Sequence, residues 1–314
     1  MPELPEVQTT VDGINSEVKG FTITDIWTSY NSPFHHGKDN VKNPDYFKSF
    51  KKNVIGSKIK SAERQGKNVL IHLSNNRTIL AHMKMTGHFM HGKYQQMSEP
   101  KETEQNNILR WIPSEKNSPL ADPFNKHIRL LFTLSNGKHL AFADTRKFAK
   151  VFIFETKNRE KVPDLAELGP DPLKKGFIFS VMKDRLVLRK NWKIKQALLD
   201  QSVIAGIGNI YSDEMLWSSN IHPLSVVSKI PEDKLKKLYT EMRNVLKKGL
   251  NFGGDSTSDY RNIYGLPGAF QHKHNVYRRA GKPCPKKDGG VIERIKIGGR
   301  STHFCPVHQV LYKK

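Results

Sequence analysis

The 314-residue sequence predicts an α+β multidomain protein: an N-terminal two-layer β-sandwich with a leading helix, then a helical part that ends in a finger-like β-hairpin. Three observations support this fold class. Apolar segments typical of strands alternate with turn residues between positions 21 and 155. Residues 163–176 contain three prolines and two glycines, which is typical of a linker. Beyond this linker, apolar residues recur at helical spacing.

The first predicted element is an amphipathic helix close to the N-terminus. Pro5 suits the first turn of a helix, because the N–H that proline lacks would have no partner there. Apolar residues then recur at helical spacing, and Gly20 ends the pattern. These apolar residues are Val7, Val11, Ile14 and Val18. We therefore expect the N-terminus in a fixed place, at the positive end of a helix dipole.

Strand-like segments follow this helix and build the predicted sandwich. Turn sequences between them, above all Asn136-Gly137, indicate antiparallel hairpins. The segments are 21–27, 68–74, 78–85, 128–135, 139–145 and 150–155. Between Phe89 and His127 the sequence is polar and contains prolines, which predicts a surface loop.

The C-terminal part is predicted to contain helices and a terminal hairpin. One helix opens at Ile194 and a longer one covers 235–246, while AGIGN (205–209) ends one helix and starts the next. From Val291, two strand-like segments meet at Gly298-Gly299. The predicted organisation is a sandwich domain over 1–160, a linker over 161–178, a helical domain over 179–270 and a hairpin over 271–314.

Charge narrows the class of partner. Lys and Arg number 52 against 30 Asp and Glu, which leaves a net charge of +22. Residues 271–314 alone carry 11 basic and 2 acidic side chains, hence +9. Such an excess of cations attracts polyanions, and nucleic acid is favoured over an anionic membrane.

Other bulk features indicate a cytoplasmic protein. No apolar run approaches the roughly 20 residues that a membrane-spanning helix needs. The acidic start has no basic region followed by an apolar stretch, so no secretory signal is visible. Two cysteines are too few for a disulfide framework, and a reducing compartment fits this count.

The opening MPELPEV can carry chemistry of its own. Removal of Met1 would expose Pro2 as a secondary amine, and an α-amine with a pKa of about 8 is partly uncharged near neutrality. An uncharged amine beside carboxylates, here Glu3 and Glu6, can attack an electrophilic carbon and form an iminium intermediate. Acidic residues near a helix start are also common for dipole reasons alone, so this motif leaves both interpretations open.

Four motifs in a fixed order carry a family resemblance. They are MPELPEV at the start, LGPDPL in the linker, AGIGNIYSDE at 205–214 and GGRSTHFC at 298–305. Together they resemble the formamidopyrimidine-DNA glycosylases, bacterial enzymes that remove 8-oxoguanine and ring-opened purines from DNA. The resemblance extends from residue 1 to about residue 310. One such motif would be weak evidence, whereas four in order are strong.

The resemblance implies a bifunctional base-excision repair enzyme that needs no cofactor for its chemistry. After base removal, the enzyme would cleave the strand at the abasic sugar. Pro2 would form the Schiff base with that sugar, Glu3 would transfer protons, and Glu6 would support them. Lys67 would reach the damaged nucleotide and Arg300 the phosphates beside the lesion, although a solvated lysine and an exposed hairpin arginine are the plain alternatives. The implied partner is damaged double-stranded DNA, bound by a monomer.

The resemblance also implies a set of DNA contacts. An extruded base leaves a gap in the stack that side chains fill. Met85, Arg146 and Phe148 match the gap-filling residues, although Met85 can also be a buried strand residue. AGIGNIY resembles a helix–two-turn–helix, in which Gly206 and Gly208 would let the backbone approach a phosphate. The further DNA-binding residues would be His127, Lys195 and Asn209, and a base-recognition loop would lie at 264–271.

Alternative functions stay open at this point. An endonuclease VIII-like glycosylase would prefer oxidised pyrimidines, but that type opens with PEGPE and lacks the gap-filling trio. A non-catalytic binder of damaged DNA would share the positive charge without the reactive terminus. A general basic nucleic-acid-binding protein would show no preference for lesions.

The C-terminal hairpin departs from the family pattern of four zinc-binding cysteines. The corresponding positions here are Cys284, Lys287, Cys305 and His308. Histidine is an acceptable zinc ligand, whereas a protonated lysine is a very poor one. A site with only three ligands is weak unless His303 or Asp288 supplies the fourth. A zinc site and a metal-free hairpin held by packing both remain open, and the metal-free form is slightly favoured.

Overall fold

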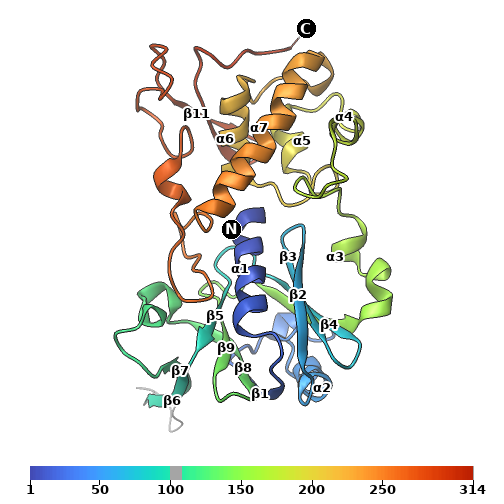
Figure 1. The fold of residues 1–314 in the computed structure, drawn as a ribbon, viewed down its shortest axis with the longest axis vertical. Helices are drawn as coiled ribbons and strands as arrows, with labels where there is room; N and C mark the ends of the chain where they lie inside the picture. The colour runs from blue at the N-terminus through green and yellow to red at the C-terminus, as the bar shows by residue number, and fades with distance from the viewer. Residues whose placement is uncertain (100–107, 314) are drawn as a thin grey trace. The chain divides into compact units, whose positions relative to one another are not determined.

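Two separate hydrophobic cores divide the chain into two units. The computed structural model describes residues 1–99 and 108–313 (Figure 1). The first unit comprises Met1–Pro2, Glu6–Glu160 and Gly253–Gly268. The second comprises Glu3–Pro5, Lys161–Phe252 and Ala269–Lys314.

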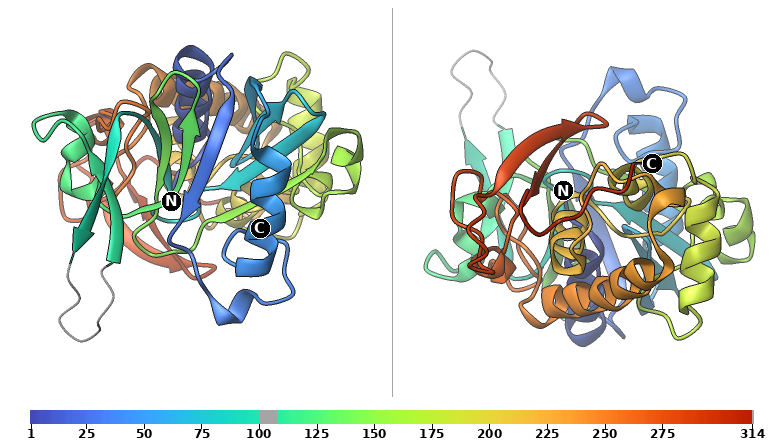
Figure 2. Two further views of the ribbon diagram at one scale, coloured as in Figure 1. Left: turned by 90° about the horizontal axis from the view of Figure 1, so that it is seen from below. Right: turned by 90° about the horizontal axis from the view of Figure 1, so that it is seen from above.

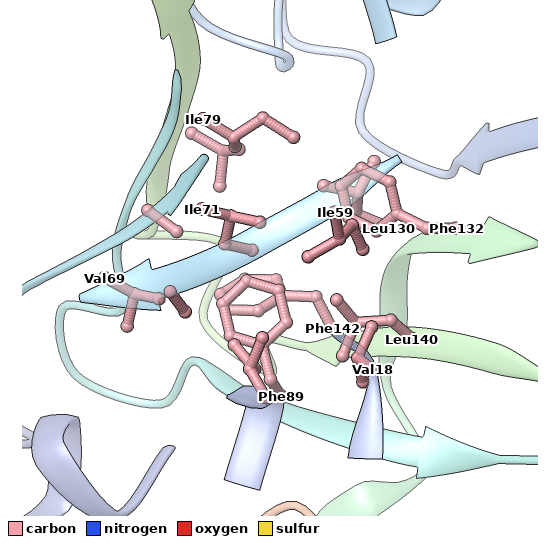
Figure 3. Packing of buried hydrophobic residues seen from close by; sticks show 14 of the residues in the cluster. Val18, Ile59, Val69, Ile71, Ile79, Phe89, Leu130, Phe132, Leu140 and Phe142 are labelled. Atoms are coloured by element: carbon pink, nitrogen blue, oxygen red, sulfur yellow. The ribbon is translucent and has the colours of Figure 1, made fainter. Parts of the chain in front are cut away.

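The first unit is the predicted β-sandwich, which is confirmed. Two antiparallel four-stranded sheets have the strand orders β1-β8-β9-β5 and β10-β4-β3-β2. Their strands are β1 (Ile23–Thr28), β2 (Ile59–Gln65), β3 (Asn68–Leu73), β4 (Arg77–His82), β5 (His88–Gly92), β8 (Ile128–Leu134), β9 (His139–Ala143) and β10 (Lys150–Glu155). Side chains from both sheets form one core, in which Ile71 and Ile79 of one sheet share the interior with Phe132 and Phe142 of the other (Figure 3). This is the inward alternation expected of a two-layer sheet protein.

The leading helix α1 (Leu4–Glu17) follows its predicted pattern. Its apolar residues from Val7 to Ile14, with Val18 just beyond its end, are buried in the core of the first unit. Gly13, in the middle of this helix, is required by packing: a Cβ there would lie 2.6 Å from Cβ of Ile263. A glycine in a helix interior costs stability relative to alanine, and here it permits close contact with the segment 253–268.

A second helix of this unit is absent from the sequence prediction. Helix α2 (Pro44–Val54) begins at the N-cap Asn43, whose side chain accepts a hydrogen bond from the backbone N–H of Asp45. Phe50 and Val54 of this helix are fully buried, four residues apart on one face. The lysines around them lower the mean hydropathy of the segment, so its apolar face was not recognised from the sequence.

The prediction of a surface loop between Phe89 and His127 is wrong for most of the described residues in this range. Strand β6 (Tyr94–Glu99) pairs antiparallel with β7 (Ile108–Pro113), and residues 100–107 of the predicted loop lie outside the described residues. Two short 3₁₀ turns follow, η2 (Pro119–Ala121) and η3 (Pro123–Asn125). Trp111 and Leu120 pack against a small apolar cluster of the first unit. Figure 2 shows the two strands, in teal, at the periphery of this unit.

The second unit is helical and ends in a hairpin, as predicted. Its elements are α3 (Pro163–Ala166), α4 (Phe179–Val187), α5 (Ile194–Leu199), α6 (Asn209–Ser219), η5 (Val227–Lys229), α7 (Glu232–Asn251), η6 (Phe270–Lys273), β11 (Glu293–Ile297) and β12 (Arg300–Phe304). A further 3₁₀ segment, η4 (Thr156–Lys161), precedes α3. Leu4 belongs to the core of this unit, together with apolar residues of α5, α6 and α7. Among the described residues, no helix is long and apolar enough to span a membrane.

The hairpin turn between β11 and β12 depends on two glycines. Ile297 pairs with Arg300, so Gly298 and Gly299 alone form the turn. Both have positive φ values, 54° and 78°, which side chains other than glycine adopt only with strain. Arg300 therefore begins β12 at a fixed position beside the turn.

We expect Gly13→Ala to destabilise the protein. Alanine gains helix propensity over glycine by about 1 kcal/mol, but overpacking against Ile263 costs about 1–3 kcal/mol, so we expect a net loss of up to about 2 kcal/mol. Urea unfolding followed by circular dichroism measures the difference. Gly176→Ala is the matched control, because a Cβ at Gly176 has no atom within 4 Å. A Gly13→Ala variant more stable than the parent protein would contradict the packing argument.

Candidate active site

The carboxylate of Glu3 lies at the N-terminus of α6. Its Oε1 accepts a hydrogen bond of 2.9 Å from the backbone N–H of Ile210, and its Oε2 one of 3.4 Å from Tyr211. The residue is 3% exposed. The first N–H groups of a helix lack partners within it, and the helix dipole favours a negative charge at that end. The N-terminal segment of the chain is thereby fixed, as its sequence predicted.

The glycines of AGIGN accommodate this N-terminal segment. A Cβ on Gly208 would lie 2.3 Å from Cδ of Glu3, and one on Gly206 would lie 2.9 Å from Leu4. The N–H of Leu4 donates to the carbonyl of Gly206 at 3.0 Å. Gly206 also has a φ of +94°. The absence of side chains at Gly206 and Gly208 therefore lets Leu4 and Glu3 pack closely against this loop. The sequence motif had instead predicted that a DNA phosphate approaches these glycines.

Glu6 organises a different part of the chain, within the first unit. Its Oε1 accepts a hydrogen bond of 2.7 Å from the N–H of Asp255, and a Cβ on Gly254 would lie 2.9 Å from the same oxygen. The hydroxyl of Tyr260 donates to the carbonyl of Glu6 at 3.0 Å. Glu6 thus anchors the segment that precedes the expected base-recognition loop. Pro2, in the same unit, is buried.

Lys67 occupies a hairpin turn but is not a solvated residue. It follows Gly66, whose φ is +60°, in the turn between β2 and β3. Its exposed fraction is only 6%. Nearby, Arg64 donates to the carbonyl of Gly66 at 3.2 Å and to Gln8 at 3.0 Å. The alternative of a lysine in free solvent at a strand start is therefore wrong.

The three expected gap-filling residues lie on two loops that share one anchor. The carboxylate of Asp144 accepts hydrogen bonds from the hydroxyl of Thr86 at 2.6 Å and the N–H of Ala149 at 2.9 Å. Met85, next to Thr86, lies in a turn beyond the end of β4 and is half-buried. The alternative interpretation, in which Met85 is a buried residue of a strand, is therefore wrong.

Arg146 and Phe148 are both exposed on the second of these loops. The guanidinium of Arg146 stacks over the ring of Phe148 at 4.5 Å, and Phe148 is 50% exposed. A large exposed aromatic ring held by a cation has no partner in a core, so both side chains are available to a ligand.

His127 lies at the start of β8 and is connected to the same anchor. Its carbonyl accepts a hydrogen bond of 3.0 Å from the N–H of Asp144. Burial lowers the pKa of the His127 imidazole, and the positive charges of Arg129 and Lys126 lower it further. The surroundings of His127 are therefore cationic, as a phosphate-contacting residue requires.

Lys195 does not present its charge at the surface, which corrects the sequence interpretation. Its side chain is 0% exposed, and Nζ donates to Asp213 at 2.5 Å and to Ser212 at 2.6 Å. The other carboxylate oxygen of Asp213 accepts from the backbone N–H of His303 at 2.9 Å. A buried charge needs a partner of opposite sign, and this pair joins α5, α6 and β12. In this structure Lys195 supports the hairpin instead of contacting a phosphate.

Asn209, the first residue of α6, contributes to the same support. Its side-chain amide donates to the carbonyl of Ser301 at 2.8 Å, next to the exposed Arg300. At the turn, a Cβ on Gly298 would lie 3.1 Å from Nε2 of Gln196. The hairpin that presents Arg300 is therefore positioned by side chains of α5 and α6.

Two further residues of this site, Tyr277 and Glu214, are absent from the sequence predictions. Burial raises the pKa of the Tyr277 phenol, and the negative charge of Glu3 raises it further, so the two groups are near each other. Glu214 accepts hydrogen bonds from the backbone N–H groups of Asn275, Val276 and Tyr277 at 2.9–3.1 Å. Asp213 and Glu214, two adjacent acids in an otherwise uncharged helix, were the available signal, because buried acids need hydrogen-bond donors.

A cluster of potential metal ligands closes the base of the hairpin. Cys284, Asp288, Cys305 and His308 each offer one ligand atom, and these atoms lie within 4.8 Å of one another. Sγ of Cys284 lies 3.7 Å from Nδ1 of His308, and Sγ of Cys305 lies 3.5 Å from Asp288. Tetrahedral zinc with sulfur and nitrogen ligands places neighbouring ligand atoms about 3.3–3.8 Å apart. The donor set therefore fits zinc.

The fourth position of this cluster belongs to Asp288. Lys287 is exposed with a φ of +55°, and the next residue, Asp288, enters the cluster in its place. The backbone N–H of Gly290 lowers the pKa of Asp288 to about 2, and His308 contributes to the same shift. His303, the other candidate, instead pairs with Asp213 at 3.1 Å.

Comparison with known proteins agrees with this geometry over nearly the whole chain. Residues 1–151 match the formamidopyrimidine-DNA glycosylase N-terminal domain, and residues 168–261 match the H2TH domain of the same glycosylase. A formamidopyrimidine-DNA glycosylase of Desulfitobacterium hafniense is 36% identical over 310 residues, covering 99% of this chain and 100% of the relative. That of Bacillus subtilis is 32% identical over 308 residues, covering 97% and 98%.

Solved structures give the same result. A complex of the Lactococcus lactis Fpg with DNA containing an abasic site has a TM-score of 0.78 and 28% identity, and covers 98% of this chain and 99% of that one. A complex of a point mutant of the same protein with DNA containing Fapy-dG has a TM-score of 0.78 and 29% identity, with the same coverage. The fold, the ordered motifs and the full-length relatives lead to one conclusion: this chain belongs to the formamidopyrimidine-DNA glycosylase family.

Proposed function

We propose that this protein is a bifunctional DNA glycosylase and abasic-site lyase that removes formamidopyrimidines and 8-oxoguanine in base excision repair. The observation that carries the proposal is the Glu3 carboxylate, buried and held by backbone N–H groups of α6, directly beside the residue that becomes the N-terminus when Met1 is removed. The named activity of the full-length relatives and the lesion DNA in the related structures support it.

Pro2 is the nucleophile in this proposal. Its secondary amine attacks C1′ of the damaged nucleotide, the bond from C1′ to the base breaks, and the base leaves with the bonding electron pair. Glu3 accepts the proton that the attacking amine loses and passes it to the ring oxygen, so that the sugar opens and an iminium forms between Pro2 and C1′. Loss of a proton from C2′ then expels the 3′-phosphate, and water releases Pro2 from the remaining iminium.

The other site residues bind DNA in this proposal. Lys67 and Arg300 neutralise phosphates of the damaged nucleotide and its neighbours. Met85, Arg146 and Phe148 fill the gap that the extruded base leaves, which is consistent with the exposure of Phe148 and the stacking of Arg146 on it. His127 contacts a phosphate, and Asn209 and Lys195 hold the hairpin that carries Arg300.

The cluster of Cys284, Asp288, Cys305 and His308 holds a structural zinc in this proposal. The zinc would fix the base of the hairpin and take no part in the chemistry. Asp288 replaces the ligand that Lys287 does not supply, which removes the reason for favouring a metal-free hairpin.

Borohydride added during reaction with an 8-oxoguanine duplex is expected to trap a covalent complex through Pro2. Glu3→Gln should lower the rate of trapping by about 10²–10⁴-fold, because it removes the proton donor. Asp12→Asn, which changes an exposed carboxylate on α1, is the control and should react like the parent protein. Mass analysis of the linked peptide identifies the attached residue. A complex formed through a lysine, or full activity with Met1 retained, would overturn the mechanism.

Metal analysis of the purified protein is expected to give about one zinc per chain. Asp288→Ala should lower this content and the temperature of unfolding, whereas Lys287→Ala should leave the zinc content unchanged, because Lys287 is exposed and lies outside the cluster. Inductively coupled plasma mass spectrometry and thermal melts measure the two quantities. Protein prepared in zinc-supplemented medium that contains no zinc, or Asp288→Ala that keeps it, would contradict the assignment.

A further inference from the structure

Strand β7 contributes to a cavity in which only His127 has a role in the function proposed above. The cavity has a volume of about 550 Å³ and lies between β1, β7 and the start of β8 in the first unit. Leu109 to Ile112 of β7 form one wall. Figures 1 and 2 show β7 at the periphery of this unit. Residues 126–129 form the opposite wall.

The lining of this cavity is cationic. Arg110, Lys126, His127 and Arg129 all line it, and none of its described lining residues is acidic. Burial lowers the pKa of Arg129, and the nearby charge of Arg110 also lowers it, although Tyr30 and Asp144 act in the opposite direction. Asp144 lies outside the lining, and its carboxylate accepts hydrogen bonds from the hydroxyls of Tyr30 and Thr86. This concentration of positive charge fits an anionic ligand.

Two tryptophans give the cavity a second property. Trp27 and Trp111 both line it, with ring centroids 6.4 Å apart at an interplanar angle of 65°. Leu109, beside them, is 50% exposed. Cationic side chains next to aromatic rings are the combination that binds nucleotides: the cations bind the phosphate, and the rings stack on the base or pack on the sugar.

The cavity is connected to the loop that carries Arg146 and Phe148. The carbonyl of His127 accepts a hydrogen bond of 3.0 Å from the N–H of Asp144, and Nε of Arg129 donates to the carbonyl of Asp144 at 3.2 Å. Asp144 in turn anchors this loop through the N–H of Ala149. Through Asp144, the cationic cavity is therefore connected to the loop whose Arg146 and Phe148 would enter the DNA stack.

We propose that this cavity binds one nucleotide of the DNA strand that flanks the lesion, outside the reaction centre. Its phosphate lies at Arg110, Lys126 and Arg129, and its base or sugar packs against Trp111. The inference rests on the proposed DNA-repair function, and it gives β7 a role in binding. This strand thus lengthens the bound stretch of DNA.

The test compares two double variants that each remove two positive charges from the first unit. Arg110→Ala/Lys126→Ala changes the cavity, and Lys48→Ala/Lys52→Ala on α2 is the matched control, with all four residues exposed. The probe is a duplex with a central tetrahydrofuran abasic analogue, and binding is measured by fluorescence anisotropy over a range of salt concentrations. The analogue cannot react, so binding is separated from chemistry.

The cavity variant is expected to reduce the slope of log affinity against log salt by about one, because the proposed site holds a single phosphate and each phosphate contact contributes about 0.9. At about 0.1 M salt this corresponds to roughly eightfold weaker binding. The control should keep the parent slope. Equal slopes and affinities for the two double variants would overturn the cavity proposal. A parent protein that shows no preference for the abasic duplex would instead overturn the proposed function.

Photocrosslinking supplies a positional readout. With 5-iodouracil placed in turn at each position around the analogue, crosslinks to the peptide that contains Trp111 are expected from adjacent positions on one side of the lesion only. Crosslinks to this peptide from every position, or from none, would contradict a defined nucleotide site. Trp111→Phe should lose the crosslink and keep at least part of the affinity, because an aromatic ring remains.

Discussion

The organisation of the site depends on one carboxylate at one helix end. Glu3 accepts hydrogen bonds from the first N–H groups of α6, where the helix dipole stabilises negative charge. This interaction requires a glycine at 208 and fixes the residue next to Pro2. A reactive amine at a chain terminus is useful only if the terminus is held, since a frayed end would lose the orientation that a nucleophile needs.

Helix α6 then extends this order to the hairpin. Its first residue, Asn209, donates a hydrogen bond to the carbonyl of Ser301. The carboxylate of Asp213 accepts from Lys195 and from the N–H of His303. The carboxylate of Glu214 accepts from backbone N–H groups of residues 275–277. These buried polar groups have partners on different elements, so the network sets the relative positions of α5, α6 and β12. Arg300 and Tyr277 are therefore positioned by polar side chains of α6.

Regular apolar spacing in the sequence predicted several elements, and interrupted spacing hid the others. Helix α1, six strands and the terminal hairpin have uninterrupted patterns or glycine turns. Helix α2 and strand β2 carry lysines and other polar residues among their apolar positions, and β7 follows a long polar stretch, so periodicity alone did not identify them. Among site residues, motif position indicated Glu3 as a residue of the site. It could not show that Lys195 is buried against Asp213 or that Asp288 replaces Lys287, because both depend on contacts between residues far apart in the sequence.

The distance along the chain between Glu3 and Ile210 has a consequence for biosynthesis. The two residues are 207 positions apart, so the ribosome must add the residues between them over about 10–40 s before this bond can form. During that interval the first residues remain accessible to an aminopeptidase, whereas in the finished fold Pro2 is buried. Since the proposed reaction needs Pro2 as the first residue, we expect Met1 to be removed from the nascent chain, before folding shields the new amine.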